Sequence, residues 1–377
     1  MQVPVKVILT RWLPSNWRTI MPVADLSFLT KKIELAELHV HVGSSGSPAL
    51  MWDIAHQSGL KLPVGDFWEF EEMVTVKKPL TGDNPVIKFN EYLKIFNLTE
   101  LIQSSPLAME RIIYDAIGGA YRNNNITTLE LRFCPMLRNR EGEQDLDHII
   151  MASLAGLDRA LLAYPQVRAG LIFEMDRRFS LEKNQIILQK ALKYKNRGVV
   201  GIDIAGPRLD DFDYSAYAEI YQEAASNGLG TTIHTGEEGS SEEMGRVIKE
   251  IQPLRVGHGV KAAWDKNLMH KLQEQNIILE ICPTSNLRVG VIQDLKELSF
   301  VLKTFLSEGV KFTVNTDGPE FFQTNIRQEF RLLLENNILS RDEILKVNQI
   351  AHEASFINNS DFARFNPLNG KKASRFS

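Results

Sequence analysis

The chain has 377 residues, of which 44% are hydrophobic and 24% charged, and its formal net charge is -4. These proportions are typical of a globular protein and exclude disordered and collagen-like chains. The weakly acidic balance provides no overall basic field for nucleic acid, and the chain has no run of about 18 uncharged apolar residues that could span a bilayer.

Two features of the chain predict a cytoplasmic protein. The apolar run at 5–9 is interrupted by Lys6 and lacks a following cleavage pattern of small residues, so we expect no secretory signal. The two cysteines, Cys134 and Cys282, lie far apart inside apolar, strand-like runs. We therefore expect buried thiols in a reducing compartment, with a disulfide as the alternative.

Short apolar or β-branched runs alternate along the chain with longer amphipathic segments. Eight runs are typical of strands, at 33–41, 126–133, 169–175, 199–205, 230–234, 254–258, 277–281 and 311–316. Helical periodicity lies between most of them, at 181–194, 214–226, 242–251 and 295–307. This alternation indicates parallel βαβ units, and the count predicts one α/β domain over 1–377, a (β/α)8 TIM barrel. A doubly wound open sheet is the alternative, although Gly43-Ser-Ser-Gly46 does not match its G-x-G-x-x-G turn.

One connection is much longer than the others. About 85 residues separate His41 from the second strand, whereas a crossover needs only about a dozen. This segment contains helix-like stretches at 48–58 and 106–122 and the aromatic residues Phe67, Trp68 and Phe70. We expect a helical insertion over about 44–125 that forms a lid, with an extra packing layer as the alternative. Residues 1–30 would form an N-terminal extension.

Residues with metal-binding chemistry gather at strand ends. His39 and His41 end the first strand run, His234 and His258 end the fifth and sixth, and Asp317 follows the eighth. A barrel brings these ends to one face, where active sites form. Residues i and i+2 of a strand point the same way, so His39 and His41 face one interior point. Three imidazoles and a carboxylate suit Zn²⁺.

A carboxylate follows one of these histidines closely. Glu237 is three residues after His234, which would bring it above the metal as a general acid or base. The alternative is that Glu237 and Glu238 cap the following helix. The remaining histidines fall in helix-like segments and are interpreted as packing or surface residues: His56, His148, His270 and His352.

Taken in order, these motifs resemble the adenosine deaminase family of zinc aminohydrolases, within the amidohydrolase superfamily. The resemblance rests on Glu37-Leu-His-Val-His41, Glu130-Leu-Arg-Phe133, Gly201-Ile-Asp-Ile-Ala-Gly206, His234-Thr-Gly-Glu237, Arg255-Val-Gly-His-Gly259, Ile281-Cys-Pro-Thr-Ser-Asn286 and Asn315-Thr-Asp317. No motif covers 1–30 or the segment after about 330. Cytidine-type deaminases are disfavoured, because Cys282-Pro283 is not part of a P-C-x-x-C motif.

The resemblance implies one Zn²⁺ per chain, bound by the four strand-end ligands His39, His41, His234 and Asp317. The fourth strand lacks the bridging lysine typical of two-metal relatives. His258 would accept a proton from the attacking water. Glu237, in its protonated form, would donate to purine N1, and the Gly206 backbone N–H would contact N3. The implied reaction is hydrolytic deamination of a 6-aminopurine with release of ammonia.

Two positions depart from the family pattern. Gly43 stands where the family commonly has an aspartate for the ribose 5′-hydroxyl, and Gly318 where a second aspartate would contact N7. The leading hypothesis is deamination of adenosine or a related nucleoside. The alternatives are a 5′-modified adenosine such as aminodeoxyfutalosine, adenine itself, and an inactive barrel that serves as a binding module.

The glycine at position 43 carries an expectation of its own. Without the aspartate, 5′-deoxyadenosine should be deaminated within about tenfold of adenosine, and the small residues should leave room for larger 5′ groups. A small-molecule purine nucleoside is the expected partner, with neither nucleic acid nor membrane. The oligomeric state stays open, a homo-oligomer included.

Overall fold

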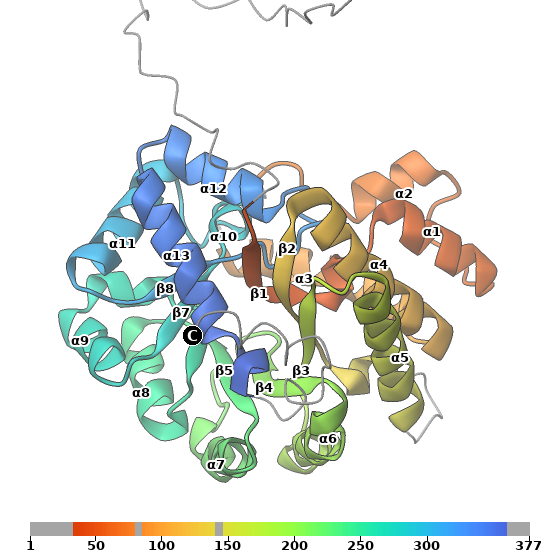
Figure 1. The fold of residues 1–377 in the computed structure, drawn as a ribbon, viewed down its shortest axis with the longest axis horizontal. Coiled ribbons are helices and arrows are strands. Elements are labelled where there is room, and N and C mark those ends of the chain that lie inside the picture. The colour runs from red at the N-terminus through yellow and green to blue at the C-terminus, as the bar shows by residue number, and fades with distance from the viewer. Residues whose placement is uncertain (1–32, 80–84, 140–145, 360–377) are drawn as a thin grey trace, which may run out of the picture.

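Eight parallel strands form a nearly closed barrel with helices around it (Figure 1). The structure is a computed structural model that describes residues 33–79, 85–139 and 146–359. The strands follow each other around the sheet in chain order, from β1 to β8. The predicted α/β class and TIM barrel are therefore confirmed. The expected N-terminal extension, and the chain after 359, lie outside the described residues.

The eight strands are close to those predicted. They are β1 (Leu35–His41), β2 (Ile126–Phe133), β3 (Arg168–Asp176), β4 (Val199–Ala205), β5 (Gly230–Thr235), β6 (Arg255–His258), β7 (Ile278–Ile281) and β8 (Phe312–Val314). Nearly every strand residue is buried, because the barrel interior covers one face and the helices cover the other. This is why the strands read as continuous apolar runs.

Most of the helices that follow the strands cover the outside of the barrel. After β2 the helices are α5 (Asp147–Ala163), α6 (Leu181–Tyr194), α7 (Ala218–Ser226), α8 (Ser241–Ile251), α9 (Lys266–Glu274), α10 (Pro283–Val289), α11 (Leu295–Ser307), α12 (Ile326–Glu335) and α13 (Arg341–Ala354). Helix α10 instead lies near the carboxyl ends of the strands. Short 3-10 turns are η2 (Pro135–Arg138), η3 (Lys195–Arg197), η4 (Tyr214–Tyr217), η5 (Val260–Trp264) and η6 (Phe356–Asn359). Side-chain oxygens cap several N-termini, as Asp294 does for α11.

The barrel closes where β8 meets β1. Val40 pairs with Asp317 in a parallel bridge, and the His41 backbone N–H donates to the Asp317 carbonyl at 2.9 Å. The Asp317 N–H donates in turn to the His39 carbonyl at 3.0 Å. Closure therefore places residues about 280 positions apart in direct contact, with their side chains at the carboxyl ends of the strands.

The long insertion after β1 is mainly helical in the described residues. It contains η1 (Val42–Ser44), α1 (Pro48–Gln57), α2 (Phe67–Met73), α3 (Pro85–Ile102) and α4 (Pro106–Asn124). In Figure 1, α1 and α2 lie at the periphery, on the right of the view. Phe67 and Phe70 of α2 contact Trp52 of α1, with ring centroids 5.9 and 5.4 Å apart, while Trp68 is exposed. The aromatic cluster thus packs the insertion internally.

The 3-10 turn η6 packs against the barrel near the first residues of β5 and β6. Phe356 lies against the glycines of β4 and β5, where a Cβ at Gly230 would come 2.0 Å from its ring. The guanidinium carbon of Arg255 is 3.6 Å from the centroid of the same ring. Ile357 joins Ile172 and Val200 in a small buried cluster. Gly230 is therefore required for close approach rather than for a positive φ.

Replacing Phe356 by Ala should lower the free energy of unfolding by about 3–5 kcal/mol, the usual cost of deleting a buried phenyl ring. The physical reason is that the glycines cannot fill the space that the ring leaves. Urea titration followed by circular dichroism measures the change. Leu162→Ala is the matched control, because Leu162 is 83% exposed and should change stability by less than about 0.5 kcal/mol. Equal effects of the two substitutions on the free energy of unfolding would contradict the assignment of Phe356 to the core.

Both cysteines are free and buried, which confirms the expectation of thiols over a disulfide. In the described part of the chain, no helix combines the length and apolar character needed to cross a membrane.

Candidate active site

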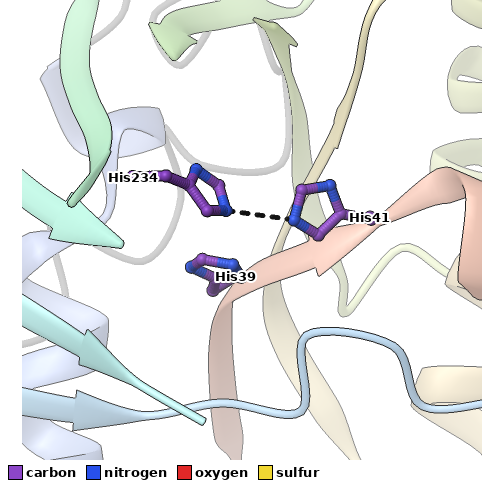
Figure 2. Close-up of side chains that lie close together, drawn as sticks. All are labelled: His39, His41 and His234. Carbon is purple, nitrogen blue, oxygen red and sulfur yellow. Dashed lines mark hydrogen bonds between the residues drawn. The ribbon is translucent and has the colours of Figure 1, made fainter. Parts of the chain in front are cut away.

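The strand-end residues selected from the sequence come together at one end of the barrel. His39 and His41 come from β1, His234 from β5 and His258 from β6, and Asp317 follows β8. Figure 2 shows the imidazole rings of His39, His41 and His234 facing one another. Adjacent ring centroids in this group lie 4.7–5.3 Å apart.

The potential ligand atoms are closely grouped. His41 Nε2 lies 3.2 Å from His234 Nε2. Asp317 Oδ1 lies 3.4 Å from His41 Nε2 and 3.8 Å from His39 Nε2. The ligand atoms of His39, His41 and His234 fall within 4.8 Å of one another, as do those of His39, His258 and Asp317. Three imidazoles and a carboxylate at these separations can surround a single ion.

Each of the three clustered imidazoles has a carboxylate behind it. The Nδ1 atoms of His39, His41 and His234 lie 2.7, 2.8 and 3.0 Å from carboxylate oxygens of Glu280, Glu174 and Asp203, respectively. A carboxylate at Nδ1 keeps the proton on that atom and leaves Nε2 with a lone pair for a metal ion. The Nε2 atoms accordingly face the centre of the cluster.

A buried arginine connects two of these carboxylates. Arg132 Nη1 and Nη2 each lie 2.8 Å from a carboxylate oxygen, of Asp203 and Glu280 respectively. Arg255 reaches Glu280 from below, with Nε 2.7 Å from Oε1. Buried charges without partners would be strongly unfavourable, so the network stabilises each member.

The sequence interpretation gave these supporting residues no role. A signal for them was present, because Glu174 and Glu280 are charged residues flanked by apolar neighbours in buried strands. Charged residues are almost never fully buried unless they are paired.

The electrostatics of the cluster also fit a metal ion. Burial, with Arg132 and neighbouring imidazoles, holds the pKa of His39 and His234 well below the usual value. Both imidazoles are therefore neutral at pH 7, the form that can bind a metal ion. Burial lowers the pKa of His41, but Glu174 and Asp317 outweigh it and raise the net value, so protons compete with a metal ion there. Among the described residues, His39 Nε2 is buried without a hydrogen-bond partner.

Glu237 lies beside the cluster in an environment that favours the protonated acid. Burial, with the negative charges of Asp317 and Glu238, raises its pKa well above the usual value. Its Oε2 atom is 3.4 Å from His258 Nε2, and its side chain is 12% exposed. The N-cap of α8 is Ser240, whose hydroxyl accepts from the Glu243 N–H. The capping alternative for Glu237 therefore has no support.

His258 and Asp317 are held in strained backbone conformations by neighbours from α10. Their φ angles are +60° and +64°, in the left-handed region that non-glycine residues rarely adopt. Ser285 Oγ donates to Asp317 Oδ2 at 2.6 Å, and the Asn286 amide contacts His258 Nδ1 at 3.0 Å. Burial lowers the pKa of His258 to about 3, so the ring is neutral at pH 7.

A cavity of about 310 Å³ opens above the cluster and is lined by His41, Glu237, His258, Asp317 and Gly206. The φ of Gly206 is +87°, and a Cβ there would lie 2.9 Å from the Asp176 carboxylate oxygens. Position 206 therefore requires glycine. The insertion contributes to the cavity wall through α3 but not through Phe67, Trp68 or Phe70.

The space beside Gly43 is filled, which corrects the expectation of extra room there. A Cβ at this position would lie 3.0 Å from Phe96 Cδ1 and 3.4 Å from Arg138 Nη2. A Cβ at Gly318 would meet Ser44 Oγ at 2.9 Å. His56, His148, His270 and His352 lie on α1, α5, α9 and α13, and none of them lines the cavity.

A parallel eight-stranded barrel with histidines and an aspartate converging at its strand ends defines an amidohydrolase-type barrel, a metal-dependent class. The adenosine deaminase family model matches residues 34–365. The chain belongs to the adenosine deaminase family. It is a hydrolase that acts on C–N bonds of purines, and its reaction is aminopurine deamination.

A relative from another organism agrees with this placement, and two solved structures share the fold. The chain is 30% identical over 337 residues to an adenosine deaminase of Clostridium kluyveri, covering 89% of this chain and 93% of the relative. Its structure is similar to adenine deaminase from Arthrobacter aurescens, with a TM-score of 0.75, 21% identity and 89% and 97% of the two chains covered. It also resembles a zinc-bound amidohydrolase from Burkholderia ambifaria, with a TM-score of 0.73, 17% identity and 95% and 97% coverage.

Proposed function

We propose that this enzyme deaminates adenosine or a closely related 6-aminopurine nucleoside with the help of one zinc ion. The observation that carries the proposal is the buried Glu237, with a raised pKa, in the same cavity as the histidine and aspartate cluster. An acid that stays protonated at neutral pH can donate to a purine ring nitrogen. The relatives named adenosine deaminase support the same substrate class.

His39, His41, His234 and Asp317 would hold the zinc ion. Tetrahedral ligands about 2.0–2.2 Å from Zn²⁺ lie about 3.3–3.6 Å from one another. The observed separations of 3.2, 3.4 and 3.8 Å between their donor atoms support this assignment. When bound, the ion supplies Lewis acidity that lowers the pKa of a water molecule toward about 7.

Glu237 and Gly206 would orient the purine ring. The protonated Glu237 carboxyl donates to N1, which withdraws electrons from C6 and makes that carbon more electrophilic. The Gly206 backbone N–H donates to N3, at a position where a side chain would strike Asp176. Two contacts on one edge of the ring hold C6 over the ligand cluster, so binding prepares the reacting geometry.

His258 would accept the proton of the attacking water at Nε2. A neutral imidazole does this only if Nδ1 carries the ring hydrogen. Amide orientation is assigned from the hydrogen-bond network, and the orientation of Asn286 that serves the reaction has Oδ1 accepting from Nδ1–H. Asn286 thereby selects the basic nitrogen.

The expected setting is that of a small-molecule enzyme of the cytoplasm. Two buried free thiols support a reducing compartment. The α3 helix of the insertion would act as the lid, because it supplies Phe96 and Glu100 to the cavity wall.

The experiment that tests the proposal is a deaminase panel with adenosine, adenine, 9-methyladenine and 5′-substituted adenosines, followed by absorbance and released ammonia. We expect adenosine or another nucleoside to have the highest kcat/KM. The purified holoenzyme is used, with zinc content measured in parallel. If no 6-aminopurine nucleoside is deaminated by zinc-replete enzyme, the proposed function is wrong.

A further inference from the structure

An ion pair between the insertion and the loop after β2 forms the cavity wall beside Gly43. Arg138 ends η2, and its Nη1 lies 3.1 Å from Oε1 of Glu100 on α3. The Arg138 side chain is 1% exposed and that of Glu100 16%. Both residues line the same cavity as Glu237. The pair therefore reaches the substrate cavity from two segments that are distant in sequence.

The Arg138 guanidinium has N–H donors that no acceptor among the described residues binds. Within the described ranges, neither Nε nor Nη1 makes a hydrogen bond, although Nη1 contacts Glu100 electrostatically. The third nitrogen, Nη2, lies beside Gly43, 3.4 Å from where a Cβ at that position would be. It is therefore the Arg138 donor placed to meet an acceptor of a ligand in the cavity.

The charges around this pair differ from those around Glu237. Burial raises the pKa of Glu100, as do Glu174 and Asp176, while Arg138 and Arg178 lower it. These five groups thus occupy one region of the cavity. None of them is among the charges that act most strongly on the Glu237 pKa, which are Asp317, Glu238, Arg177 and Lys261. The Arg138–Glu100 pair therefore lies on the Gly43 side of the cavity and not beside Glu237.

Both guanidinium groups in this region are already paired with carboxylates. Arg178 pairs with Asp176 through Nε and Nη2 at 2.8 and 2.6 Å, and Arg138 pairs with Glu100. A phosphate with about −1.5 to −2 charges would leave the carboxylates uncompensated. A hydroxyl group suits both partners, because it donates to a carboxylate and accepts from a guanidinium.

We propose that Arg138 and Glu100 bind a hydroxyl group of the sugar on purine N9 and so select nucleosides over free bases and nucleotides. The proposal rests on the proposed function, since it assumes that C6 lies at the ligand cluster. The N9 substituent then lies at the far side of the ring from C6. Gly43 alone predicts tolerance of a missing 5′-hydroxyl. The ion pair reverses that expectation for whichever hydroxyl it binds.

The test compares kcat/KM of the holoenzyme for adenosine, its 2′-, 3′- and 5′-deoxy analogues, 9-methyladenine and adenosine 5′-monophosphate. At least one deoxy analogue should lose about tenfold or more, because hydrogen bonds to charged groups are the stronger kind. In Glu100→Gln and Arg138→Met, that preference should fall to within about threefold. Glu110→Gln is the matched control, since Glu110 forms a surface ion pair with Arg159 outside the cavity, and it should keep the wild-type preference.

Three results would overturn the inference. The first is that the wild type has the same kcat/KM for all three deoxy analogues. The second is that the two variants lower kcat/KM by the same factor for every substrate. The third is that the wild type prefers adenosine 5′-monophosphate and loses this preference in Arg138→Met. Glu100→Gln keeps the size of the side chain, so its preference for adenosine over the deoxy analogue tests the proposal if Arg138→Met does not fold. Failure of the proposed function looks different, because the wild type would then deaminate no nucleoside in the set.

Discussion

Glu237→Gln should lower kcat by about 10²–10⁴, the contribution typical of a general acid. The amide has nearly the shape of the carboxyl group but cannot transfer a proton to the purine. Because burial and the nearby Asp317 and Glu238 keep Glu237 protonated, the change exchanges one neutral group for another. Fold and metal content should therefore stay as in the wild type. Steady-state kinetics, with thermal unfolding and metal analysis of the same samples, measures all three.

Glu238→Gln is the matched control, because the two glutamates are adjacent and both line the cavity. It should change kcat far less than Glu237→Gln. The pH profile gives a second readout: the active form is protonated, so activity should decline as pH rises through the raised pKa of Glu237. A large effect of Glu238→Gln with a nearly silent Glu237→Gln would show that the catalytic carboxyl is misassigned.

Removal of the Asp317 carboxylate should cost both the metal ion and the activity. Purified wild type should hold about one equivalent of zinc. Loss of a residue behind a ligand weakens metal binding by about 10–100-fold, and loss of the ligand itself should exceed that. Asp317→Asn is the sharper variant, because asparagine tolerates the left-handed backbone at φ +64° better than alanine does. Metal content after dialysis against a chelator measures the effect.

The control for Asp317→Asn is Asp158→Asn, which removes a carboxylate from a surface ion pair with Arg197. It should retain the wild-type zinc content and rate. Chelation of the wild type should abolish activity, and added zinc should restore it. A consistent content of two metal equivalents would place the enzyme among two-metal barrels and contradict the single-ion assignment. Full zinc retention in Asp317→Asn would exclude this aspartate as a ligand.

Local pattern was sufficient for the barrel elements and for the grouping of the candidate site residues. The strands β2 and β4 and the helices α6 and α11 have the predicted bounds, since apolar periodicity and capping residues act within a few positions of the chain. The convergence of the histidines, Asp317 and Glu237 was predicted because a parallel barrel brings all strand ends to one face. That rule needs the order of the elements and no knowledge of side-chain contacts.

The tertiary structure alone decided which distant side chains meet. Only the assembled barrel pairs Arg132 with Asp203 and Glu280. The sequence predicted open space beside Gly43, whereas α3 folds over that position and brings Phe96 and Glu100 to it. Such contacts depend on how an insertion packs against a barrel, and residue periodicity carries no information about that packing.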